Sequence, residues 1–136
     1  MQLFEDLLRK PLALPVESSY AVANGVVYCV LGVMLIAWPG VTQVVFEDRD
    51  FVGDEAGLMR VLGLTLVVIG WLYVFGGRTG RRQFAAASVI DRLVFVPLVL
   101  LPLAIGGLFP HLLVTFTLLD MSLAVGAWVL LRRNSA

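Results

Sequence analysis

Long uninterrupted apolar runs dominate the chain, and four of them are long enough to cross a lipid bilayer. A transmembrane helix needs roughly 20 mostly apolar residues to span about 30 Å of hydrocarbon. The four runs predict helices over about residues 18–39, 57–77, 84–109 and 111–131. Barrel strands would alternate apolar and polar residues over about ten positions, whereas residues 26–36 are continuously apolar apart from glycine. The pattern therefore predicts an all-α fold in which residues 1–136 form one domain, a bundle of four transmembrane helices.

The segment before the first run has a different pattern. Within residues 2–8, four apolar side chains share one helical face opposite Glu5 and Asp6. Such amphipathicity is typical of a short interfacial helix lying on the inner leaflet. An unstructured tail is the alternative interpretation.

Composition supports a membrane environment. The chain has 136 residues, of which 60% are hydrophobic and 15% are charged, against roughly 45–50% and about 25% in soluble proteins. A soluble fold of this size could not bury so much apolar surface, and the lipid bilayer is the partner that can cover it. Ten basic and ten acidic residues cancel, so no net charge favours nucleic acid, and we expect no nucleic-acid partner.

The charges between the runs predict the orientation. Three basic clusters fall before the first run, between the second and third, and after the fourth: Arg9 and Lys10; Arg78, Arg81 and Arg82; Arg132 and Arg133. The loop between the first and second runs is acidic: Glu47, Asp48, Asp50, Asp54 and Glu55, with only Arg49 opposing them. Basic loops remain in the cytoplasm. We therefore expect an antiparallel, multi-pass bundle with both termini cytoplasmic.

Small residues mark the faces on which the helices should pack, because close approach in lipid depends on them. Each of three runs carries a stripe of such residues: Ala21, Gly25, Cys29 and Gly32; Gly63, Gly70 and Gly77; Thr117, Asp120, Ala124 and Ala127. The third run contains Pro97 and Pro102 instead, and each proline removes a backbone donor and favours a kink. Such a kink can line a cavity, or neighbouring helices can absorb it.

Charged residues inside the runs are the strongest functional signal, since each costs about 2.5–3.5 kcal/mol to insert. Asp120 precedes Arg132 by twelve residues, about 18 Å of helix. Arg92 follows Arg82 by ten residues, about 15 Å of helix. Equal depth on successive helices predicts an Arg92–Asp120 ion pair, with Asp91 turned about 100° away.

A polar face on the first run occupies the same half of the bundle, with Glu17, Tyr20, Asn24 and Tyr28 at helical spacing. These residues raise the hypothesis of a polar ligand pocket in the cytoplasmic half. Its candidate residues are Glu17, Asn24, Tyr28, Asp91, Arg92 and Asp120. The alternative is structural: a buried ion pair and its hydrogen bonds would fix the register of the helices.

Other chemistry finds little support in the sequence. Cys29 and His111 are the only cysteine and histidine, so disulfides, CxxC pairs and bis-histidine haem ligation are excluded. The glycine-rich turn after the second run lacks the preceding strand and the lysine of a phosphate loop. We expect no metal and no cofactor, and the sequence favours a protein that is not an enzyme.

A short pattern in the second run carries a resemblance. Gly57-x-x-Arg60-x-x-Gly63, followed by Gly70, Tyr73 and a basic turn, resembles the DoxX-like small four-helix bacterial membrane proteins. Trp38-Pro39 at the end of the first run and the acidic loop fit the same layout. The resemblance implies the bacterial inner membrane, and some proteins of that group look like accessory subunits of redox complexes. It transfers no catalytic residue.

Three functional classes follow. The first is a bundle that binds a lipophilic small molecule, or assists its passage, through the pocket. The second is an accessory or assembly subunit of a larger membrane complex, such as a respiratory one, and a homo-oligomer is a related alternative. The third is a small intramembrane enzyme acting on a lipid-like substrate, in which a buried carboxylate would serve as acid or base.

Overall fold

The computed structural model describes residues 13–133, which form helices joined by short turns and contain no strand. In chain order these are α2 (Val16–Ala37), α3 (Val41–Phe46), α4 (Glu55–Gly77), α5 (Arg82–Ile90), the π-helical turn η1 (Asp91–Phe95), α6 (Val96–Ile105) and α7 (Pro110–Arg133). Because α5, η1 and α6 follow one another without a break, they form one long third helix. The expected all-α architecture is thus confirmed. The predicted N-terminal interfacial helix lies outside the described residues.

Among residues 13–133, four helices are long and apolar enough to cross a membrane: Val16–Ala37, Glu55–Gly77, Arg82–Ile105 and Pro110–Arg133. Their bounds differ from the predicted ones mainly at the third helix, which we expected to run to residue 109. Helix α6 instead ends at Ile105, and the chain turns through Gly107, whose φ of +87° suits a residue without a Cβ. The short helix α3 was not expected either.

Two of the helices, α2 and α4, pack backbone against backbone. A Cβ built on Gly25 would lie 2.6 Å from the carbonyl oxygen of Gly70, and one on Gly32 would lie 2.5 Å from that of Gly63. Real Cβ atoms do not approach so closely, so only glycine allows this separation. The stripes of small residues predicted on these two runs therefore do form a helix interface.

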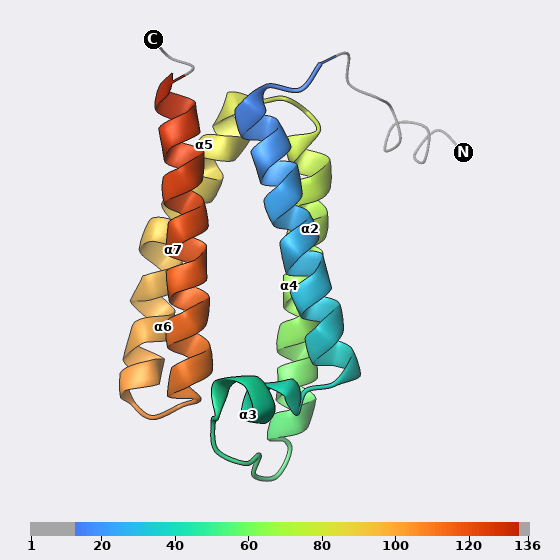
Figure 1. The fold of residues 1–136 in the computed structure, drawn as a ribbon, viewed down its shortest axis with the longest axis vertical. Helices are drawn as coiled ribbons and strands as arrows, with labels where there is room; N and C mark the ends of the chain where they lie inside the picture. The colour runs from blue at the N-terminus through green and yellow to red at the C-terminus, as the bar shows by residue number, and fades with distance from the viewer. Residues whose placement is uncertain (1–12, 134–136) are drawn as a thin grey trace, which may run out of the picture.

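The bundle consists of two pairs of helices (Figure 1): α2 with α4, and α6 with α7. Helix α5 leans across and contacts α2, α4 and α7, whereas the main contacts of α6 are with α7 and η1. The two pairs therefore converge at the end where α5 lies and leave α4 and α6 less closely packed further along.

The change of direction between α5 and α6 coincides with η1, just before Pro97. Proline offers no backbone N–H and crowds the carbonyl four residues earlier, here that of Leu93. A π-helical turn is one of the local adjustments that absorbs such a defect. The predicted irregularity of the third helix is therefore present, and it includes Asp91 and Arg92.

Polar contacts join different elements at both ends of the bundle. At the end carrying α3, the backbone N–H groups of His111 and Leu112 donate to the Asp48 carboxylate at 3.1 and 2.9 Å, which caps the start of α7. At the other end, Arg82 Nη2 donates to the Leu131 carbonyl at 2.6 Å. The Asp48 contact therefore links the loop before α4 to α7, and the Arg82 contact links the start of α5 to the end of α7.

The loop before α4 is held by a bidentate salt bridge. Arg49 donates from Nη1 and Nη2 to the two carboxylate oxygens of Glu55, at 2.7 and 2.6 Å. This hydrogen bonding raises the pKa of the Arg49 guanidinium above its ordinary value. The Arg49 guanidinium also lies 4.7 Å from the centre of the Phe109 ring, so the loop leans on the turn before α7.

Candidate functional site

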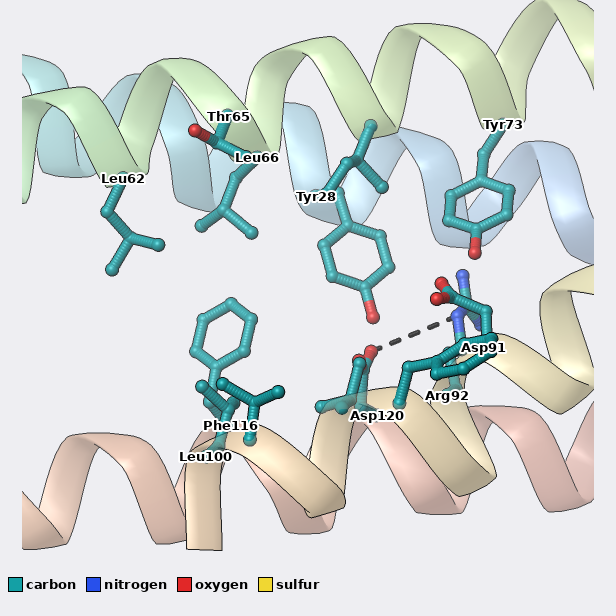
Figure 2. Close-up of a pocket in the computed structure, with 14 residues that line it drawn as sticks. Tyr28, Leu62, Thr65, Leu66, Tyr73, Asp91, Arg92, Leu100, Phe116 and Asp120 are labelled. Carbon is teal, nitrogen blue, oxygen red and sulfur yellow. Dashed lines mark ion pairs between the residues drawn. The ribbon is translucent and has the colours of Figure 1, made fainter. Parts of the chain in front are cut away.

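A cavity of about 290 Å³ lies between the two helix pairs. All four long helices contribute to its wall: Tyr28 from α2; Leu62, Thr65, Leu66, Ile69 and Tyr73 from α4; Asp91, Arg92, Phe95, Val96, Val99 and Leu100 from the third helix; Phe116 and Asp120 from α7. Figure 2 shows most of these side chains pointing into the space between the helices. The volume falls just below the range typical of small-molecule sites.

The cavity exists because the third helix changes direction. Beyond η1, α6 stays with α7 while α4 stays with α2, so the faces of α4 and α6 do not close on each other. Four of the lining residues, Asp91, Arg92, Phe95 and Val96, come from the irregular turn and the residue after it. The turn thus both opens the cavity and places charge in its wall.

Arg92 is the central polar group, with only 2% of its surface exposed. Its Nε lies 3.9 Å from Asp120 Oδ1, as the dashed line in Figure 2 marks. This is the ion pair that the equal depths of the two residues predicted. At 3.9 Å it is a charge contact that is too long for a hydrogen bond.

Two tyrosine rings flank the Arg92 guanidinium. Its carbon lies 4.4 Å from the centre of the Tyr73 ring and 5.1 Å from that of Tyr28. Cation–π attraction of this kind is worth about 2 kcal/mol or more when the cation is desolvated. The rings stabilise the charge without supplying any hydrogen-bond acceptor to the guanidinium.

Hydrogen-bonding capacity is left over at the centre of the site. Within residues 13–133, the Nε, Nη1 and Nη2 of Arg92 make no hydrogen bond. The buried Tyr28 hydroxyl and Asp120 Oδ1 likewise have no partner there. Unmade hydrogen bonds of buried charged groups cost more than the 1–3 kcal/mol typical of neutral ones. A molecule in the cavity with matching polar atoms would recover that cost.

Comparisons with protein-family models, curated proteins and solved structures found no match to this chain. The function must therefore be inferred from the chain's own residues.

The six candidate residues divide into two groups. Four of them, Tyr28, Asp91, Arg92 and Asp120, line the cavity. Asp91 is exposed whereas Arg92 is buried, as expected for neighbours about 100° apart on a helix. In Figure 2 the Asp91 carboxylate is drawn at the same end of the cavity as Arg92.

Glu17 and Asn24 are buried but do not line the cavity. They share a face of α2 with Tyr28, yet they lie one to three turns closer to the end where α5 crosses over. There the helices converge, and Tyr20 packs against a small apolar cluster that includes Ala85 and Ala127. The shared face on α2 was recognisable from the sequence, but the point at which the bundle closes was not.

Tyr73, Thr65 and Phe116 are site residues that sequence reasoning did not place in the pocket. Tyr73 follows Gly70 by three positions and so shares its inward face of α4, which is the signal that could have found it. Thr65 donates its hydroxyl to the Val61 carbonyl at 3.0 Å, so this polar group is already satisfied within the helix. No sequence pattern distinguishes Phe116 from its apolar neighbours.

The cavity is open on the side between α4 and α6. Phe95 and Val99 line it and are 58% and 55% exposed. Because these two side chains line the cavity and are also exposed at the surface of the bundle, they mark the mouth of the cavity. This mouth lies beside the apolar outer faces of the long helices.

No metal site accompanies the cavity. Among residues 13–133, no three histidine, cysteine or carboxylate side chains lie together as ligands for a metal ion. The polar groups present can bind through hydrogen bonds and charge.

Proposed function

We propose that the chain is an integral protein of the bacterial inner membrane, an antiparallel four-helix bundle with both termini in the cytoplasm. The end of the bundle that carries the start of α2 and the end of α7 also carries the turn between α4 and α5 (Figure 1). The basic residues Arg78, Arg81, Arg82, Arg132 and Arg133 lie at that end. The acidic loop lies at the opposite end, and this asymmetry supports the orientation.

Topology reporters test this orientation. A green fluorescent protein fused after Ala136 should fluoresce in cells, whereas alkaline phosphatase fused there should be inactive. Alkaline phosphatase inserted at Gly53, an exposed glycine of the acidic loop, should be active. The opposite pattern at both sites would refute the orientation.

We further propose that the protein binds a lipophilic small molecule in the cavity, or assists its passage, and that it is not an enzyme. The observation that carries this proposal is Arg92: a guanidinium fully buried at the cavity wall that makes no hydrogen bond to any described residue. Intramembrane charges of this kind are costly and mark binding sites or ion pathways. Most of the remaining wall is apolar, as a lipophilic ligand requires.

Native mass spectrometry of gently extracted protein is the direct test, and one substitution makes it specific. Val99→Trp should fill the mouth of the cavity, since Val99 lines it. Leu98→Trp is the matched control, because Leu98 lies next to it on α6 but lines none of the three cavities described for this chain. We expect bound mass in the wild type and in Leu98→Trp, and its loss in Val99→Trp.

Two other results would replace the proposal. A stable complex with another membrane protein, undisturbed by Val99→Trp, would favour the accessory-subunit role that the DoxX-like resemblance implies. Turnover of a bound lipid that stops when Asp91 or Asp120 becomes asparagine would favour an intramembrane enzyme. Equal ligand mass in both tryptophan variants would place the ligand outside this cavity.

A further inference from the structure

The cavity has a polar end and an apolar end. In Figure 2 the side chains of Tyr73, Asp91, Arg92 and Asp120, with the Tyr28 hydroxyl, gather at one end. Leu62, Leu66, Leu100 and Phe116 lie towards the other. The occupant of such a space must itself have a polar head and an apolar tail, arranged along α4.

The charges at the polar end indicate the charge of the head. One guanidinium, Arg92, faces this end together with two carboxylates, Asp91 and Asp120. An anionic head would approach both carboxylates, and a cationic head would meet the buried guanidinium. Either charged head would therefore meet a group of its own sign, which repels it, and an uncharged head meets none.

The unused hydrogen-bonding groups indicate the chemistry of the head. The three nitrogens of Arg92 require acceptors, and Oδ1 of Asp120 requires a donor. The Tyr28 hydroxyl can serve as either. A head that carries a carbonyl and a hydroxyl satisfies these groups together, whereas an ether or a hydrocarbon does not.

The path of the tail follows from two further cavities on the same side of α4. One of about 200 Å³ lies towards the α3 end and shares Leu62 with the main cavity. The other, of about 260 Å³, lies towards α5 and shares Ile69, Tyr73 and Asp91 with it. From the α5 end, the three follow one another along α4, which faces the third helix at the first two and the turn before α7 with the start of α7 at the last. A chain lying lengthwise along α4 would pass from one to the next.

We propose that the ligand is an uncharged single-chain amphiphile of the monoacylglycerol type, with ester and hydroxyl groups in its head. The head binds between Arg92 and Asp120, and the chain extends along α4 past Leu66 and Leu62 towards the α3 end. The ligand enters sideways from the hydrocarbon through the mouth between α4 and α6. This assignment rests on the binding function proposed above and specifies its ligand.

Probes that share a monounsaturated eighteen-carbon chain and differ in the head test the assignment. The full chain in mild detergent is titrated by native mass spectrometry with 1-monooleoylglycerol, oleyl sulfate, oleyltrimethylammonium and 1-octadecene. We expect the uncharged ester to bind most tightly, because hydrogen bonds to a charged group contribute roughly tenfold or more in affinity. The double variant Arg92→Leu/Asp120→Leu should lose that preference and still bind 1-octadecene.

Asp120→Asn provides a second variant that preserves size and is less disruptive. It leaves one carboxylate against the Arg92 guanidinium, so the affinity for oleyl sulfate should rise relative to that for the uncharged ester. A ratio of the two affinities equal to that of the wild type would overturn the assignment of the head group.

The outcomes separate this inference from the binding function itself. If all four probes bind equally and are lost only in Val99→Trp, the cavity binds lipophilic molecules but the assigned head is wrong, and water solvates the polar end. Preference for either charged probe in the wild type also overturns the uncharged head. If Val99→Trp and Leu98→Trp bind every probe as the wild type does, the binding function fails together with the inference.

Discussion

The close contact between α2 and α4 leads to a quantitative prediction about Gly70. An alanine Cβ at this position would lie 2.6 Å from both the Gly25 carbonyl oxygen and the Cys29 Sγ. Ordinary contacts begin at 3.4 Å, so the two helices would have to separate by about 0.8 Å. Overpacking of this kind costs about 1–3 kcal/mol.

Gly57→Ala is the matched control on the same helix. A Cβ at Gly57 would meet nothing within 4 Å, so the substitution brings only the gain in helix propensity, at most about 1 kcal/mol. Both variants share that gain, and the difference between their free energies of unfolding therefore isolates the overpacking. We expect Gly70→Ala to be less stable than Gly57→Ala by about 1–3 kcal/mol.

Unfolding by sodium dodecyl sulfate in mixed micelles, followed by near-ultraviolet circular dichroism, measures this difference. A midpoint for Gly70→Ala equal to that for Gly57→Ala would refute the backbone-to-backbone packing of α2 on α4.

Two further predictions use the same unfolding measurement. Arg92→Leu should destabilise the protein by about 3–5 kcal/mol because it leaves the Asp120 carboxylate buried without its counter-charge. Adding Asp120→Leu should recover most of that loss. A double variant no more stable than the single one would show that Arg92 is not the main partner of Asp120. Asp48→Ala should lower the free energy of unfolding by about 0.5–2 kcal/mol through loss of the α7 cap. Asp50→Ala, at an exposed position of the same loop, should change it by less than about 0.5 kcal/mol. Equal losses at the two positions would contradict the capping role of Asp48.

Much of the fold could be predicted because it depends on local pattern. Twenty or more apolar residues in a row indicate a spanning helix whatever surrounds them, and a stripe of glycines marks a face that can approach a neighbour closely. The pairing of Arg92 with Asp120 followed from depth alone, since successive helices bring residues at the same depth to the same level.

The site was harder to predict because its position depends on how the helices tilt. The sequence placed Glu17 and Asn24 with the other polar residues, and nothing in it revealed that α5 crosses over at their level. Pro97 predicted an irregularity in the third helix. It did not predict that the irregular turn would lie at Asp91–Phe95 and include both Asp91 and Arg92. Asp48 was one acidic residue among five in its loop, and only the position of α7 singles it out as a cap.

The glycine contacts between α2 and α4 also bear on how the protein assembles during synthesis. These are the first two long helices of the described chain to leave the ribosome, and they pack on each other without any contribution from later residues. This hairpin of α2 and α4 can therefore fold before the third helix has been translated. Asp48 lies in the loop of this hairpin. Its carboxylate can accept the hydrogen bonds from the backbone N–H groups of His111 and Leu112 only once the last helix, α7, is in position.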